Sequence, residues 1–165
     1  MLFRSLHDKL MLSGSGLVVE TIDAIVSGNA QRIPQTLFIK EGETLKDAPK
    51  LTKESGLIDW KRSSSDIFNQ IRGLSPYPAA FSTLFNGKRE IPVKIYSAII
   101  ENKAFQTGTM SLTAGETESD SRSFLRVGCG SGTLRITSIQ AAGKKRLEIK
   151  DFLAGFRDIS TYKFI

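Results

Sequence analysis

The C-terminal half of this chain alternates short apolar segments with turn sequences, and this pattern limits the folds that it can adopt. Asn86-Gly87 lies between two apolar segments, which is a strong short-range signal for a β-hairpin, and Lys88-Arg89 lengthens its loop. The glycine-rich sequence GCGSG, residues 128–132, predicts a second turn between strands rather than a phosphate-binding loop. The strands joined by these turns are expected at 81–85, 91–100, 124–127 and 133–141.

A short helix is predicted just before these strands. Ser63, with Asp66 three residues later, forms a capping box that starts a helix over 63–73. Pro76 and Pro78 end it and lead into an extended segment.

The remaining segments complete a mainly β domain with some helix. A further strand is expected at 108–112, a polar and mobile loop at 115–123, and a closing helix at 147–156. About five short strands with tight turns favour a small Greek-key barrel similar to an oligonucleotide-binding (OB) fold. We therefore predict a C-terminal domain over residues 63–165.

The N-terminal segment, residues 1–28, predicts one amphipathic helix. Ser5 and Asp8 form a capping box, apolar residues follow at approximately helical spacing, and Gly28 is suited to end the helix. Residues 14–16, Gly-Ser-Gly, weaken its middle, so a kinked helix or two shorter ones is the alternative.

A linker is expected at residues 29–62, because prolines, a glycine and scattered charges leave no sustained hydrophobic periodicity of a helix or strand there. A short strand is predicted within it at 37–40. Nothing earlier in the chain supplies a sheet for the preceding helix to cover. We therefore expect that the partner of its apolar face is missing.

The distribution of charge favours an anionic partner for the C-terminal half. Residues 1–80 contain 10 Lys or Arg against 9 Asp or Glu, whereas residues 81–165 contain 13 against 8. A local basic surplus suits a polyanion, because neutralising its phosphates releases condensed counterions. A generally basic, solvated surface is the alternative.

Several classes of site and location are disfavoured by composition. A single cysteine, Cys129, excludes an internal disulfide, and one cysteine with one histidine cannot build a closed zinc site. Cys129 has no histidine to act as its base, so an inert thiol is expected. The apolar runs are far shorter than a membrane span and no signal peptide is evident, so we expect a cytoplasmic protein without a membrane segment or a metal.

Three long sequence blocks resemble the C-terminal half of the methionyl-tRNA formyltransferases. They are PKLTKESGLIDW (residues 49–60), NQIRGLSPYPAAF (69–81) and LRITSIQAAGKKRLEIKDFLAG (134–155). The resemblance covers nearly the whole chain after Ser5. Asp47 stands where the family usually has an aromatic residue, and Tyr77 where it often has tryptophan.

The resemblance implies an origin for each part of the chain. Residues 1–28 would be the last helix of a Rossmann-like α/β catalytic domain, followed by the interdomain linker and the C-terminal domain. The family transfers a formyl group from 10-formyltetrahydrofolate to the amino group of initiator Met-tRNA, using Asn, His and Asp motifs that do not occur here. We therefore expect a truncated, catalytically inactive chain that binds no cofactor itself, with His7 as a surface or packing residue.

Basic residues at loops and strand ends are the candidates for RNA binding. In the family the positively charged barrel binds the acceptor arm of the tRNA, and a lysine of the linker lies near the end of that arm. Lys50 occupies the matching position. Lys94, Arg126 and Arg135 lie on strands, and the sequence leaves open whether they share a face. The RNA-binding residues that we predict are Lys50, Lys88, Arg89, Lys144, Lys145, Arg146 and Lys150.

Two alternatives to this function stay open at the sequence level. The first is another enzyme that the resemblance also allows, because the same two-domain arrangement occurs in formyltransferases that act on amino-sugar nucleotides and in formyltetrahydrofolate dehydrogenase. A standalone nucleic-acid-binding module is the second alternative, although an independent barrel would not begin with a helix that lacks its sheet. We expect a monomer, with self-association through the exposed N-terminal helix as the other outcome.

Overall fold

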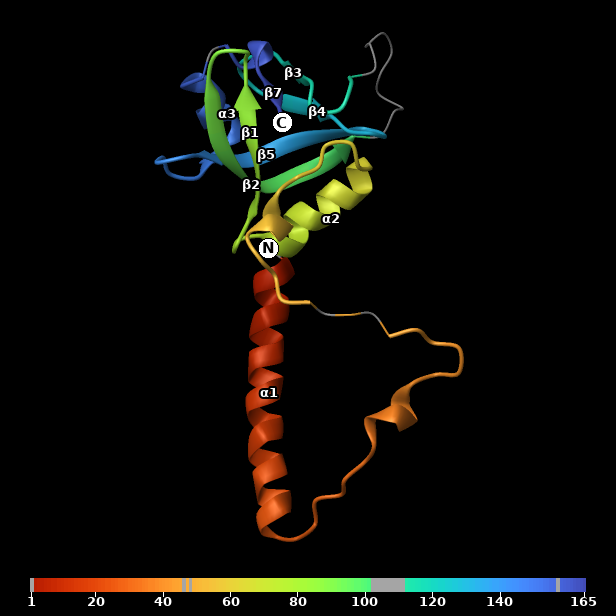
Figure 1. Ribbon diagram of the computed structural model, residues 1–165. Coiled ribbons are helices and arrows are strands. Elements are labelled where there is room, and N and C mark those ends of the chain that lie inside the picture. Colours follow the sequence, from red (N-terminus) through yellow and green to blue (C-terminus); the bar gives the residue numbers. More distant parts are fainter. Residues whose placement is uncertain (1, 46, 48, 102–111, 157) are drawn as a thin grey trace. The chain divides into compact units, whose positions relative to one another are not determined.

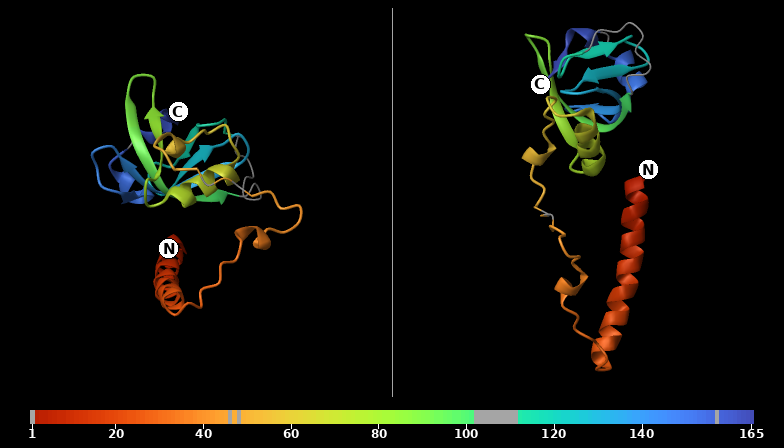
Figure 2. Two further views of the ribbon diagram at one scale, coloured as in Figure 1. Left: turned by 60° about the horizontal axis from the view of Figure 1, so that its bottom comes forward. Right: turned by 90° about the vertical axis from the view of Figure 1, so that its right-hand side faces the viewer.

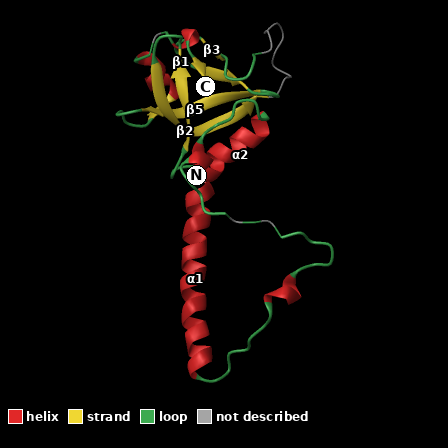
Figure 3. Ribbon diagram, viewed as in Figure 1, coloured by secondary structure: helices red, strands yellow, loops and turns green. Residues whose placement is uncertain are grey.

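The chain forms two compact units, Met1–Lys50 and Leu51–Ile165. The computed structural model describes residues 2–45, 47, 49–101, 112–156 and 158–165. Figure 1 shows the helices and strands along the sequence, and Figure 3 separates helix, strand and loop by colour. Residues 51–62, which the sequence places in the linker, belong to the second unit.

The first unit consists of one long helix, α1 (Leu2–Val26), and an extended tail. Its start differs from the prediction, because the helix already begins at Leu2 rather than at a cap on Ser5. No glycine or proline among residues 2–4 interrupts it. The helix is also continuous through Gly14 and Gly16, so the two-helix alternative is wrong. Gly28 follows the last turn with φ +73°, as expected for a glycine stop.

The short strand predicted at 37–40 is absent from the described tail. A 3-10 helix, Gln35–Phe38, lies there instead, and the amide of Leu37 donates to the carbonyl of Pro34 at 3.1 Å. A strand needs a neighbour to accept its hydrogen bonds, and the proline just before this segment favours a local turn.

The described residues of the second unit are built around one antiparallel sheet of seven strands. The hydrogen-bonded order is β3-β4-β5-β2-β1-β7, with β6 paired to β5. The pairing of the long central strand β2 with β5 shifts register twice, between Ile95 and Ser97 and between Ser97 and Ala98. Figure 2 shows the sheet curling around its own core. The strands are β1 (Ala80–Phe85), β2 (Glu90–Glu101), β3 (Thr117–Ser119), β4 (Leu125–Gly128), β5 (Thr133–Ala141), β6 (Leu147–Glu148) and β7 (Lys163–Phe164).

The two ends of the sheet are joined by backbone contacts that nearly close a barrel. The amide of Phe164 donates to the carbonyl of Gly115, just before β3, at 2.8 Å. Gly115 has φ +82°, and a Cβ there would lie 2.2 Å from the carbonyl oxygen of Phe164. Only glycine permits this approach. The predicted mainly β fold with a small OB-like barrel is therefore confirmed.

Short helices and the lead-in segment 51–63 cover the barrel. Helix α2 (Ser64–Leu74) begins as predicted, because the Ser63 hydroxyl accepts from the Asp66 amide at 3.1 Å. The 3-10 helices Glu54–Gly56 and Ile159–Thr161 and helix α3 (Ile149–Ala154) are short. The side chain of Gln70 on α2 donates to the carbonyls of Ser55 and Leu57, which ties the lead-in segment to the helix.

The indole of Trp60 fixes the lead-in segment to β1 and to the residues at the C-terminal end of the chain. It is buried, and its Nε1 donates to the hydroxyl of Ser82 on β1 at 2.9 Å. The Ser82 hydroxyl donates in turn to the carbonyl of Ile165 at 2.8 Å. The ring also packs against Phe164, with centroids 5.0 Å apart. Trp60 is thus a core residue of the second unit.

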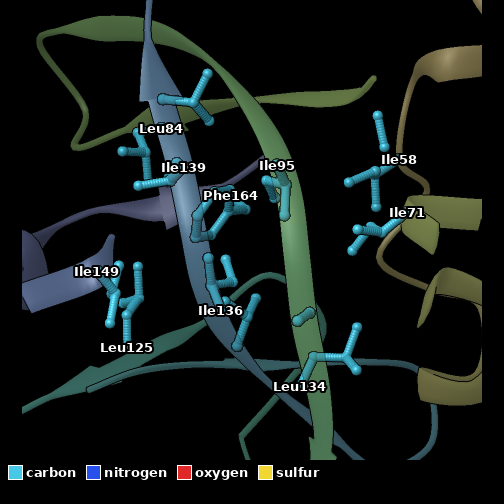
Figure 4. Packing of buried hydrophobic residues seen from close by; sticks show 14 of the residues in the cluster. Ile58, Ile71, Leu84, Ile95, Leu125, Leu134, Ile136, Ile139, Ile149 and Phe164 are labelled. Carbon is cyan, nitrogen blue, oxygen red and sulfur yellow. The ribbon is translucent and has the colours of Figure 1, made fainter. Parts of the chain in front are cut away.

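The core of the second unit comes from the inward positions of the strands and one face of α2 (Figure 4). Alternate residues of β1 are buried, as expected for a strand with one face inside, and β5 alternates in its middle with two adjacent buried residues near each end. Fully buried side chains include Ile67, Ile71, Leu84, Ile95, Leu125, Leu134, Ile136, Ile139 and Leu153.

Most of the local predictions for this unit are confirmed. The loop between β1 and β2 spans four residues, since Phe85 pairs with Glu90, and GCGSG joins the paired strands β4 and β5. The loop expected at 115–123 is partly wrong, because β3 lies within it. Its polar residues form a strand by pairing with β4. The strand predicted at 108–112 lies, except for Leu112, outside the described residues.

Candidate nucleic-acid interface

Exposed lysines gather in the turn between β5 and β6. The amide of Lys144 donates to the carbonyl of Ala141 at 3.0 Å, and Gly143 has φ +72°, so residues 141–144 form a closed turn. The side-chain amide of Gln140 also donates to the carbonyl of Lys144. Lys144 and Lys145 are exposed on this fixed backbone. The turn therefore exposes two positive charges on a backbone of fixed conformation.

Arg146, predicted as an RNA ligand, is held by the protein itself. Its Nε donates to the hydroxyl of Ser138 at 2.8 Å, and its guanidinium lies 4.6 Å from the ring centroid of Tyr96. The phenol of Tyr96 donates to Gln140, which also supports the turn. Stacking on an aromatic ring and bonding to a hydroxyl use part of the guanidinium. Arg146 thus anchors the lysine turn.

A second basic pair lies in the loop between β1 and β2. Its backbone is shaped by the side chain of Asn86, whose oxygen accepts from the amides of Lys88 at 3.1 Å and Arg89 at 2.8 Å. Gly87 has φ +86°, and both basic side chains are exposed. Figure 1 shows this loop and the β5–β6 turn as separate projections of the barrel.

The other two predicted RNA ligands lie in different places. Lys150 is exposed on the first turn of α3, five residues after Lys145 in the chain. Lys50 is exposed at the end of the first unit, next to Leu51 in sequence. The structure thus groups Lys144, Lys145, Arg146 and Lys150 around β6, and leaves Lys88 with Arg89 in another loop.

The two arginines on strands share a face, which the sequence left open. Arg126 and Arg135 are cross-strand partners on β4 and β5. Both pair with Glu101, and Arg126 also pairs with Glu118 at 3.5 Å. These carboxylates balance the arginine charges, so this face offers little to a phosphate. Among the described residues of this unit, the exposed lysines without an ion pair are in the loops and turns, on β2 at Lys94, on α3 at Lys150 and on β7 at Lys163.

The cysteine and the histidine show no catalytic arrangement. Cys129 is buried, and burial raises the pKa of its thiol from 9.0 to about 11, which keeps it protonated at neutral pH. His7 is exposed on α1, 3.4 Å from the carboxylate of Asp8. In the part of the chain that the structure describes, no three His, Cys, Asp or Glu side chains gather around one point. The described helices include none that is both long and apolar enough to cross a bilayer.

A groove on the outer face of the barrel was not anticipated from the sequence. It has a volume of about 1000 Å³ and lies over β1, β2 and the end of β5, with the lead-in segment along one side. Phe81, Lys94 and Gln140 form one cross-strand row in it. Such a row requires the register of three strands, and a sequence pattern does not supply it.

The fold and its basic loops define the class of protein: a small OB-like barrel with positively charged turns. Comparison with known proteins then gives the family. Residues 50–157 match the family model described as formyl transferase, C-terminal domain. The chain therefore belongs to the formyl transferase C-terminal domain family.

Two curated relatives span almost the whole chain. The methionyl-tRNA formyltransferase of Parabacteroides distasonis is 41% identical over 160 residues, which cover 96% of this chain and 48% of that protein. The enzyme of the same name from Phocaeicola vulgatus is 40% identical over 153 residues, covering 92% and 45%. The chain thus spans about half the length of the curated relatives it matches.

A solved structure shares the fold at low identity. HypX from Aquifex aeolicus, crystallised as a variant, aligns with a TM-score of 0.54 and 19% identity, covering 84% of this chain and 22% of that one. This likeness concerns the fold alone.

Proposed function

We propose that this chain is the tRNA-binding portion of a methionyl-tRNA formyltransferase and acts in the cytoplasm. The observation that carries the proposal is the 40–41% identity to enzymes of that name across 92–96% of the chain. The whole enzyme would take its formyl group from 10-formyltetrahydrofolate. The chain has one histidine, His7, on an exposed helix, so its residues do not fit a folate-dependent catalytic site. Its contribution would be RNA affinity and orientation.

The geometry supports binding to a phosphate backbone. Lys144 and Lys145 extend from a turn whose backbone is fixed by Gln140 and by the anchored Arg146. Lys88, Arg89 and Lys150 are exposed at other loops or helix starts of the same unit. Contacts from such groups position an RNA without reading its sequence. The partner we propose is the acceptor arm of initiator Met-tRNA, because the relatives' names specify methionyl-tRNA.

The lysine turn gives a direct test through the salt dependence of binding. Each lost phosphate contact lowers the slope of log affinity against log salt by about 0.7 to 0.9. Lys144→Ala with Lys145→Ala should therefore reduce the slope for initiator tRNA by about 1.4 to 1.8. Arg146 stays in place, because its removal would also disturb the turn.

The matched control removes two exposed lysines from the first unit, Lys9→Ala with Lys40→Ala, and so changes the net charge equally. It should leave the slope within about 0.5 of wild type, since neither lysine is among the proposed RNA-binding residues and one phosphate contact is worth about 0.7 to 0.9. If the Lys144/Lys145 variant and the control give the same slope, the lysine turn is only a solvated surface and the proposed interface is wrong.

A further inference from the structure

The outer groove of the barrel combines aromatic faces with positive charge. Phe81 is half-buried in its floor, and Tyr77 at its rim is 87% exposed. Lys53 and Lys94 also line it and are exposed. Among the described residues that line the groove there is no carboxylate, and within the described chain neither lysine makes an ion pair. This combination suits a ligand with both a flat apolar ring and a phosphate.

The exposed tyrosine is presented by a fixed loop. Tyr77 lies between Pro76 and Pro78, and the amide of Ala79 donates to the carbonyl of Leu74 at 2.9 Å. Ala79 itself is buried, with φ +71°. An aromatic side chain this exposed contributes nothing to the core. It is suited to stacking on a ligand, because few of its torsions must be fixed on binding and the loss of conformational entropy is small.

The groove is continuous with the lysine turn. Gly143 lines its end, and Lys144 and Lys145 follow directly in the chain. Ala142, also in the lining, is held to Pro92 on β2 by a backbone hydrogen bond of 2.9 Å. A strand of RNA that leaves the groove at this end would reach the lysines with its next phosphates.

We propose that this groove binds an unpaired nucleotide of the RNA, with its base stacked on Tyr77 and its phosphate against Lys53 and Lys94. The inference rests on the proposed RNA-binding function and adds a site for single-stranded RNA to it. Paired bases are stacked inside a duplex and expose no face, whereas unpaired bases stack readily on aromatic side chains. The volume of about 1000 Å³ is at the upper end of the range for small-molecule sites, so a nucleotide fits.

The test compares two fluorescein-labelled RNA hairpins with the same stem, one blunt and one with a short unpaired 3′ extension. The full chain should bind the extended hairpin at least about fivefold more tightly, because stacking one base on an aromatic side chain strengthens binding by about this factor or more. Tyr77→Ala should remove the preference and leave the affinity for the blunt hairpin unchanged. Tyr77→Phe keeps the ring and should keep the preference.

Two further variants separate the groove from general effects. Lys94→Ala should lower the salt slope by about 0.7 for the extended hairpin only. Phe38→Ala removes an aromatic side chain that is 71% exposed in the first unit and should change neither affinity. A 2-aminopurine base placed in the extension should be quenched on binding to wild type and not on binding to Tyr77→Ala.

The outcomes distinguish the two proposals. If the blunt hairpin binds with a salt slope but the extension adds nothing, or if Tyr77→Ala keeps the preference, the nucleotide site is overturned and the general RNA interface stands. If neither hairpin binds at low salt, both proposals fail. If the groove instead captures an unrelated peptide while ignoring the extension, the inference is likewise overturned.

Discussion

The two units of this chain expose apolar side chains very differently. In Met1–Lys50, Leu17, Ile22 and Ile25 on α1 are 53–62% exposed. In Leu51–Ile165, residues of the same types, such as Leu84 and Ile136, are fully buried. Burial of apolar area is the main stabilising contribution to folding. The comparison teaches that helix formation in α1 rests on local propensity, whereas the barrel carries a core of its own.

The largest expected contrast is in amide exchange. Amides in β2 and β5 should exchange about a thousandfold or more slowly than those of residues 7–45, because only the barrel requires global unfolding to open. Hydrogen-exchange mass spectrometry at neutral pH measures both regions in one experiment. Similar protection in both would indicate self-association through the apolar face of α1, and sedimentation would then show an oligomer rather than the expected monomer.

A matched pair of leucines sharpens the comparison. Leu84→Ala should lower the free energy of unfolding by about 2 to 5 kcal/mol, because it leaves a cavity in the core. Leu17→Ala should change it by less than about 0.5 kcal/mol, since its side chain is 59% exposed. Urea unfolding followed by circular dichroism compares the two variants. Equal destabilisation would mean that α1 packs as tightly as the barrel.

Two glycines of the second unit test how strictly its backbone contacts are required. Gly130 donates its amide to the carbonyls of both Trp60 and Arg62, and a Cβ there would lie 1.8 Å from the carbonyl oxygen of Lys61. Gly130→Ala should cost more than about 2 kcal/mol, since backbone has to move. Gly73→Ala on α2 meets nothing within 4 Å and should be neutral or stabilise by up to about 1 kcal/mol. Thermal melts that rank the two variants in the opposite order would contradict this packing.

The smallest effect concerns the thiol of Cys129. Because burial raises its pKa to about 11 in the folded chain, above the ordinary 9.0, the thiol favours folding below about pH 9 and loses that contribution as pH rises through 11. Iodoacetamide at pH 8 should modify the folded protein slowly and the urea-unfolded protein quickly. Cys129→Ala provides the blank, and fast modification of the folded chain would show that the thiol is accessible.

Local signals in the sequence predicted much of the barrel. The capping box at Ser63 and the Asn86-Gly87 loop are set by neighbouring residues, so both were predicted correctly. Strands β3 and β7 were missed because long-range contacts define them. Residues 147–148, predicted as the start of the closing helix, form strand β6 instead by pairing with β5, and the helix spans only Ile149–Ala154. The Thr117 hydroxyl donates to the carbonyl of Tyr162 at 2.6 Å, which no local pattern indicates.

The candidate site was predicted less completely than the fold. The lysines at 144 and 145 are on an exposed turn, as a basic cluster after a glycine suggested. The role of Arg146 as an anchor depends on Tyr96, fifty residues away in the chain. The neutralisation of Arg126 and Arg135 by Glu101 likewise requires the register of three strands, so a count of charges overstated the free positive surface.

The hydrogen-bonded junction of Trp60, Ser82 and Ile165 has a spectroscopic consequence. The chain contains a single tryptophan, so its intrinsic emission reports on one place only. That place is where the lead-in segment, the first strand and the last residue meet. A red shift of the emission therefore records water reaching this junction, which lies on the side of the sheet where β1 pairs with β7. The same signal contains no tryptophan contribution from Met1–Lys50, so fluorescence and circular dichroism together distinguish the unfolding of the barrel from the melting of α1.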